Sequence, residues 1–169
     1  ASYAKFVTIT AMTDKDKGTR GITNIIVPAG TPGFSVRTPW EKMGLHGSNT
    51  TELFFDNVRV PERNLVGERG AGYKQFLIVL DGGRIAIGAM GVGIAQACLD
   101  AATKYAMERC QFGQPIGHFQ MNQDMIAQMV AEIDAARMMV HRAAWQKDQG
   151  NMNHNLEVAQ AKYLAGELA

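Results

Sequence analysis

Residues 109 to 123 read Arg-Cys-Gln-Phe-Gly-Gln-Pro-Ile-Gly-His-Phe-Gln-Met-Asn-Gln, and they separate two long segments of helical periodicity. Two glycines and a proline in this segment favour a turn and interrupt a helix. The segment therefore predicts an exposed loop between two long helices. Arg109, Gln111 and Gln120 lie in this segment, where they would suit a large anionic cofactor.

The segments on either side of this turn repeat apolar residues every three or four positions, as in helices with one packed face. In the second helix the expected packed residues are Ile126, Met129, Val130, Ile133, Ala136, Val140 and Ala144. In the first, from about Tyr73 to Glu108, they are Phe76, Leu80, Ile87, Ile94, Cys98 and Tyr105. A third helix is expected to begin near Leu156.

Glycines recur inside the first helix, and each costs roughly 1 kcal/mol relative to alanine. They are Gly82, Gly83, Gly88, Gly91 and Gly93. Close approach of another helix or of a ligand would explain them, because glycine has no side chain to obstruct either one.

Up to about residue 66 the apolar runs are short and rich in β-branched and aromatic residues, which is typical of strands. The expected strands are Phe6 to Thr10, Ile22 to Val27, Phe34 to Val36, Leu53 to Phe55, and Val58 to Val60. Turn residues separate them, for example in the segment Thr13 to Gly18. The expected fold class is therefore α+β, with an antiparallel sheet or part of a barrel followed by long antiparallel helices.

Composition narrows the function classes. The chain of 169 residues is 46% hydrophobic and 20% charged, with a net charge of +1, which is typical of a soluble globular protein. No stripe of lysines and arginines could neutralise a nucleic-acid backbone, so nucleic acid is not expected as a partner. No apolar segment of the roughly 20 residues that a membrane span needs is evident, so none is expected.

Cysteines and histidines indicate neither a metal site nor a disulfide framework. Cys98 and Cys110 match no metal motif, and a reduced location is expected: the cytoplasm, or the mitochondrial matrix in a eukaryote. The histidines have no second ligand at helical or strand spacing, so no metal is expected. They are His46, His118, His141 and His154.

Two polar groups have both a structural and a functional interpretation. Asp81 and Arg84 are three residues apart and would share a helix face. A surface ion pair explains them more simply than a ligand contact when they are considered alone. Arg109 could clamp a pyrophosphate, or it could cap the last carbonyl groups of its helix.

Four motifs, taken together in order and spacing, resemble the acyl-CoA dehydrogenase family along essentially the whole chain. They are Lys42-Met-Gly-Leu-His-Gly-Ser-Asn-Thr-Thr-Glu-Leu-Phe-Phe-Asp-Asn-Val-Arg-Val-Pro61, Leu80-Asp-Gly-Gly-Arg-Ile85, Gly93-Ile-Ala-Gln-Ala-Cys-Leu-Asp100 and Arg109-Cys-Gln-Phe-Gly-Gln-Pro-Ile116. The resemblance implies the end of the family's middle β-domain at residues 1–68 and the first helices of its C-terminal four-helix domain at residues 69–169.

The resemblance also implies site residues. Those that would line the coenzyme A thioester site are Asp81, Gly82, Gly83 and Arg84, and those that would contact FAD are Arg109, Gln111, Phe112 and Gln120. In the family a glutamate removes the α-proton of an acyl-CoA while a hydride leaves the β-carbon for the flavin, which yields a trans-2-enoyl-CoA. The implied partners are an electron-transferring flavoprotein and further copies of the chain, commonly in a homotetramer.

The chain departs from the family where the catalytic base is concerned. One branch of the family carries its glutamate directly before the arginine of the Asp-x-x-Arg motif, and here that residue is Gly83. We therefore assign no catalytic residue and expect the base beyond residue 169, in a longer polypeptide. The chain begins without methionine and stops within a helical pattern, which also suggests a fragment.

The resemblance also implies a class of substrate, and it leaves more than one activity open. The expected substrate is a short-chain or dicarboxylic acyl-CoA. Two alternatives remain: an acyl-CoA oxidase, which would pass electrons to oxygen, and a noncatalytic subunit that uses the same helices for assembly.

Overall fold

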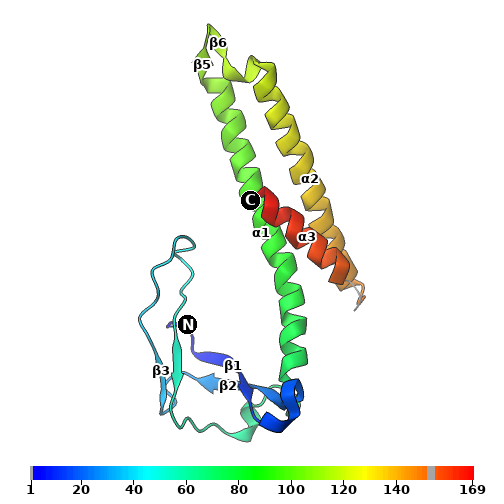
Figure 1. The fold of residues 1–169 in the computed structure, drawn as a ribbon. Helices are drawn as coiled ribbons and strands as arrows, with labels where there is room; N and C mark the ends of the chain where they lie inside the picture. Colours follow the sequence, from blue (N-terminus) through cyan, green and yellow to red (C-terminus); the bar gives the residue numbers. More distant parts are fainter. Residues whose placement is uncertain (1, 152–154) are drawn as a thin grey trace. The chain divides into compact units, whose positions relative to one another are not determined.

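A computed structural model describes residues 2–151 and 155–169, so His154 lies outside the described residues. The chain divides into two compact units, Ala1–Ile78 and Val79–Ala169. Short antiparallel strands come first and long helices follow, which confirms the α+β class (Figure 1). The elements in order are β1 (Phe6–Met12), η1 (Lys15–Gly21), β2 (Ile22–Pro28), β3 (Phe34–Val36), β4 (Leu53–Phe55), η2 (Glu62–Asn64), α1 (Gly72–Glu108), β5 (Cys110–Gln111), β6 (Gln114–Pro115), η3 (Ile116–His118), α2 (Gln120–Asp148) and α3 (Asn155–Leu168).

The first unit is built from two antiparallel strand pairs. Strands β1 and β2 pair along their full lengths, from Phe6 opposite Pro28 to Met12 opposite Ile22, and β3 pairs with β4. Within the described residues these pairs form separate two-stranded sheets and no closed barrel. Four of the five expected strands are present, and β1 extends two residues further than expected.

The expected strand at Val58–Val60 is wrong. These residues have no regular secondary structure. The chain leaves β4 through Asn57, which has a positive φ of 51°, and meets Pro61 three residues after Val58. A left-handed turn followed by a proline without an N–H leaves little extended backbone to pair in a sheet.

Buried polar side chains attach the β1–β2 sheet to the start of α1. Thr23 and Asn24 are almost fully buried in β2. The Asn24 Nδ2 donates to the Gly72 carbonyl at 3.2 Å and to Gln75 Oε1 at 2.9 Å, while its Oδ1 accepts from Thr10 at 2.8 Å. Because each polar atom of the Asn24 amide is bonded, its burial carries little desolvation cost.

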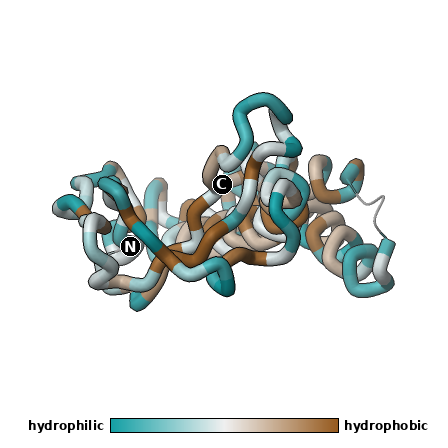
Figure 2. The backbone as a smooth tube through the Cα atoms, turned by 90° about the horizontal axis from the view of Figure 1, so that it is seen from below, coloured by the Kyte–Doolittle hydropathy of each residue, from teal (hydrophilic) through white to brown (hydrophobic). Residues whose placement is uncertain are grey.

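The second unit is a helical hairpin, α1 and α2, with α3 packed against both (Figure 1). Its core contains Val92, Ala95, Leu99, Ile133, Ala136, Val140, Ala143, Val158, Ala161 and Ala165. Hydrophobic residues follow much of the strands and helices, whereas several loops are hydrophilic (Figure 2). Three of the α2 residues that were expected to pack, Ile133, Ala136 and Val140, are in this core. Ala143 is buried there in place of the expected Ala144.

The expected packed face of α1 is not the buried one. Phe76, Leu80, Ile87, Ile94 and Tyr105 are substantially exposed, and the face with smaller residues packs instead. A Cβ on Gly91 would lie 2.5 Å from the Ala165 carbonyl oxygen, and one on Gly88 would lie 3.1 Å from Val140 Cγ2. Close helix approach thus explains these two glycines.

By length and composition α1 is long and apolar enough to cross a membrane, which differs from the expectation above. One such helix is weak evidence, because the core helices of water-soluble proteins have the same composition. Here α1 packs on α2 and α3 at its glycines, and its N-terminal half carries the charged pair Asp81 and Arg84.

Candidate functional site

A tight hairpin closes the turn between α1 and α2. Strands β5 and β6 pair Gln111 with Gln114, so Phe112 and Gly113 form a two-residue loop. Both have positive φ, 52° for Phe112 and 81° for Gly113, as a type I′ turn requires. A bulky residue in the left-handed region is strained, and such strain is found preferentially at binding sites.

The Phe112 ring projects into solvent. It is 94% exposed and packs edge to face with the Phe119 ring, with centroids 6.3 Å apart. A large apolar ring that is held outward in this way buries little surface within the fold. The geometry suits stacking against a planar group of a ligand.

Arg109 lies between the end of α1 and β5. Its N–H donates to the Tyr105 carbonyl at 2.9 Å, and its own carbonyl accepts from the Ile116 N–H at 2.8 Å. The backbone is thereby held, but the exposed guanidinium has no hydrogen bond or ion pair within the described residues. The interpretation of Arg109 as a cap for its helix is therefore not supported, and its five N–H donors remain available to an anion.

Gln120 is the first residue of α2 and therefore lies at the same end of the hairpin. Phe119 precedes it and provides no side-chain cap, but its carbonyl accepts from the N–H groups of Asn122 and Gln123 at 3.0 and 3.1 Å. Within the described residues the N–H groups of Gln120 and Met121 therefore remain without a capping side chain. Unsatisfied N–H groups and the helix dipole favour a negative group at this position. Gln111, Phe112, Arg109 and Gln120 are all exposed and together form what we call the hairpin-end site.

Two side chains that the sequence analysis did not single out brace this turn. Asn122 Nδ2 donates to the Ile116 carbonyl at 2.7 Å, and Gln123 Nε2 donates to the Gly117 carbonyl at 3.0 Å. Side-chain amides one turn into a helix are common, and nothing in their spacing distinguishes these two. Their bonds restrict the loop and so reduce the entropy lost when a ligand binds.

The predicted thioester segment lies in the first half of α1. Arg84 Nη1 and Asp81 Oδ1 form the ion pair expected from their spacing, at 2.9 Å. Both side chains retain solvent exposure, so the pair contributes little to stability. A Cβ on Gly83 would meet nothing within 4 Å, whereas one on Gly82 would lie 2.5 Å from Lys147 Nζ. Gly83 therefore leaves open space beside the pair, and Gly82 makes room for a lysine of α2.

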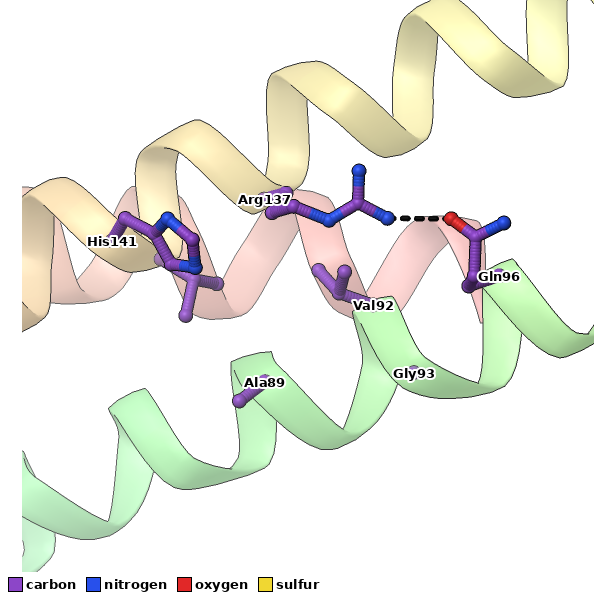
Figure 3. Close-up of a pocket in the computed structure, with 7 residues that line it drawn as sticks. Ala89, Val92, Gly93, Gln96, Arg137 and His141 are labelled. Atoms are coloured by element: carbon purple, nitrogen blue, oxygen red, sulfur yellow. Dashed lines mark hydrogen bonds between the residues drawn. The ribbon is translucent and has the colours of Figure 1, made fainter.

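A separate groove of about 290 Å³ runs between α1 and α2. Figure 3 shows Arg137 of α2 reaching across to Gln96 of α1, where its Nη2 donates to Oε1 at 2.5 Å. Arg137 also pairs with Asp134. None of the predicted site residues lines this groove, and its arginine is already bonded, so we interpret it as a packing feature of the hairpin.

No group of three His, Cys, Asp or Glu side chains in residues 2–151 and 155–169 could hold a metal ion. Cys98 and Cys110 are both free and exposed.

Antiparallel strands, a braced helical hairpin and an exposed arginine at its turn define a two-unit α+β protein. The chain belongs to the acyl-CoA dehydrogenase family. Residues 1–58 match the family model described as acyl-CoA dehydrogenase, middle domain, and residues 70–169 match that described as acyl-CoA dehydrogenase, C-terminal domain.

Similar proteins carry related names. A probable acyl-CoA dehydrogenase, YngJ, of Bacillus subtilis is 54% identical over 100% of this chain and 44% of its own length. A glutaryl-CoA dehydrogenase of Desulfococcus multivorans is 50% identical over 99% of this chain and 43% of its own. The structure of butyryl-CoA dehydrogenase from Megasphaera elsdenii matches with a TM-score of 0.95 and 43% identity, over 100% of this chain and 44% of that one. The chain thus spans less than half the length of these relatives.

Proposed function

We propose that the chain is part of an FAD-dependent acyl-CoA dehydrogenase that converts a short-chain or dicarboxylic acyl-CoA to a trans-2-enoyl-CoA. The observation that carries this proposal is the hairpin-end site, where an arginine without a side-chain partner in the described residues and an outward aromatic ring stand beside a helix N-terminus that has no side-chain cap. The names of the relatives, glutaryl-CoA and butyryl-CoA dehydrogenase, support the proposed substrate class.

The residues of the hairpin end fit an anionic dinucleotide with a planar ring. Arg109 would pair with phosphate oxygens, Phe112 would stack on a ring, and Gln111 and Gln120 would bond its polar groups. FAD, when bound, supplies the hydride acceptor that no amino-acid side chain can provide. The family membership and these four exposed side chains support FAD as the cofactor.

In the thioester segment, we assign binding and orientation to Asp81 and Arg84. Their ion pair fixes both side chains at one face of α1, and the open space at Gly83 leaves room for a ligand there. Gly83 has no side chain that could remove a proton, and we propose that the α-proton passes to a carboxylate beyond residue 169. The domain boundary at residues 68 and 69 is part of the same proposal, since the family models leave residues 59–69 between them.

The partners and location follow from the same proposal. An electron-transferring flavoprotein would receive the electrons, and a homotetramer is the proposed assembly. The large exposed side chains of α1, among them Phe76, Ile87 and Tyr105, would be covered by other parts of the polypeptide or by further copies. A cytoplasmic location, or a mitochondrial one in a eukaryote, stays a prediction.

Turnover is expected only in a polypeptide that includes the proposed carboxylate base beyond residue 169. The full-length polypeptide should oxidise butyryl-CoA or glutaryl-CoA with an electron-transferring flavoprotein as acceptor, and residues 1–169 alone should not. The measurement is steady-state product formation by both proteins, with oxygen as a second acceptor to detect an oxidase. Turnover by residues 1–169 would disprove a base beyond them, and a flavin-loaded full-length protein without any turnover would indicate the noncatalytic subunit.

A further inference from the structure

The first turn of α2 is bonded to the preceding loop by two side-chain amides of unequal exposure. Asn122 Nδ2 donates to the Ile116 carbonyl at 2.7 Å, and Gln123 Nε2 donates to the Gly117 carbonyl at 3.0 Å. Asn122 is half-buried, whereas Gln123 is exposed. Water competes less for a hydrogen bond that is partly buried, so the Asn122 bond restricts the loop more than the Gln123 bond does.

The Ile116 peptide connects Asn122 to Arg109. Its carbonyl accepts from Asn122 Nδ2, and its N–H donates to the Arg109 carbonyl at 2.8 Å. The Arg109 N–H in turn donates to the Tyr105 carbonyl of α1 at 2.9 Å. One series of hydrogen bonds therefore runs from the Asn122 side chain in α2, through Ile116 and Arg109, to the end of α1.

The loop has little room to move at Gly117. A Cβ there would lie 3.1 Å from the Ala106 carbonyl oxygen, so the loop backbone lies directly against α1. Contact with α1 and the Asn122 bond together hold the loop in one position. Without the Asn122 bond, the Ile116 carbonyl would keep the Phe119 N–H, at 3.1 Å, as its remaining partner among the described residues.

The Arg109 guanidinium has no partner within the described residues, so its own backbone determines where it lies. We propose that Asn122 is a positioning residue for the cofactor: through the Ile116 peptide it fixes the backbone of Arg109, and so it places the guanidinium for the phosphate oxygens of FAD. A backbone that is fixed before binding loses less conformational entropy when the ligand binds, which raises the affinity. This inference rests on the proposed function, which supplies FAD as the ligand of Arg109.

The test is a double-mutant cycle in the full-length protein, with FAD titration of each apoprotein. Asn122→Leu removes the donor and keeps a side chain of similar size, and it should raise the Kd for FAD about three- to tenfold, because one neutral hydrogen bond is lost. The same change in the Arg109→Ala background should raise the Kd less than about twofold, since the guanidinium that Asn122 positions is absent. Asn122→Ala, which also removes the donor but adds no bulk, should give the same pattern.

Gln128→Leu is the matched control for the loss of an amide from α2. Gln128 is exposed on the same helix, and its Nε2 donates to Asp124 Oδ2 within α2 at 2.8 Å and not to the loop. This variant should leave the Kd for FAD unchanged, both in the parent protein and in the Arg109→Ala background.

The cycle can contradict the inference in more than one way. Equal losses of FAD affinity in both backgrounds would show that Asn122 acts on the fold and not through Arg109. An unchanged Kd in Asn122→Leu, or in Arg109→Ala, would remove the positioning role. If the parent protein takes up no FAD, the proposed function fails, and hydrogen exchange of the Ile116 N–H decides separately whether Asn122 fixes the loop. Exchange about tenfold faster in Asn122→Leu than in the parent protein supports this, and equal rates contradict it.

Discussion

Arg109→Ala in the full-length protein is expected to weaken FAD binding by about ten- to a hundredfold, since one hydrogen-bonded contact to a charged group is worth roughly 1.5–3 kcal/mol. The folded protein should keep its stability, because the Arg109 guanidinium is exposed and has no partner within the described residues. The change would remove a cofactor contact and leave no buried group unpaired. FAD titration of the apoprotein measures the affinity directly.

The matched control for this variant is Lys104→Ala. Lys104 is an exposed cation near the same end of α1, and its only recorded contact is a 3.9 Å ion pair with Glu108. Its removal lowers the positive charge of the hairpin end as much as Arg109→Ala does. Equal FAD affinities of the parent protein and Arg109→Ala would contradict the assigned role, and equal losses in both variants would indicate a general charge effect.

Gly91→Ala is expected to destabilise the full-length protein by about 1–3 kcal/mol, because the added methyl group overpacks the crossing of α1 and α3. The Cβ would lie 2.5 Å from the Ala165 carbonyl oxygen, and a backbone atom cannot move aside as the end of a flexible side chain can. The midpoint of urea unfolding should fall accordingly.

Gly93→Ala provides the control on the same helix. A Cβ at Gly93 meets nothing within 4 Å, so this variant should gain the roughly 1 kcal/mol that alanine contributes over glycine in a helix. Both variants share the same change in helix propensity, so their difference reports the crossing alone. Equal unfolding midpoints for the two would show that α1 and α3 do not cross at Gly91.

Local sequence patterns predicted most of the elements. The bounds of β3 and β4 match their apolar runs. The segment predicted to separate the two long helices, residues 109–123, does so only up to Phe119, because α2 begins at Gln120. Val58–Val60 has strand composition but no strand, because pairing depends on a partner and on the turn at Asn57. Propensity describes one segment, whereas a sheet needs two.

The buried face of α1 could not be derived from periodicity. This helix is apolar around much of its surface, with large residues on one face and small ones on another. Large residues suggested the packed face, yet the described helices meet at Gly88 and Gly91, where backbones approach most closely. Which face of α1 is buried depends on how α2 and α3 pack against it, so the sequence of α1 alone does not determine it.

The sequence indicated the predicted site residues, but it did not indicate a polar pocket in the first unit. This pocket is lined by Thr13, Asp14, Lys17, Arg20, Arg69 and Gly70. Asp81 and Arg84 pair as their spacing predicts, and Arg109 is placed at the hairpin end by the local turn. Their ligand roles stay predictions. Lys17 was interpreted only as part of the turn from Thr13 to Gly18, and Arg20 was not singled out. Arg69, which lines the same pocket, is about fifty residues away in sequence, and only the fold brings it near.

The central claim is that this chain belongs to a flavin-dependent enzyme that oxidises acyl-CoA. The most direct measurement is the visible absorption spectrum of the purified full-length protein, recorded without oxygen before and after addition of butyryl-CoA or glutaryl-CoA. We expect a flavin band that is lost when one of these substrates is added. A colourless protein that does not take up FAD, or a flavin band that neither acyl-CoA changes, would contradict the proposed function.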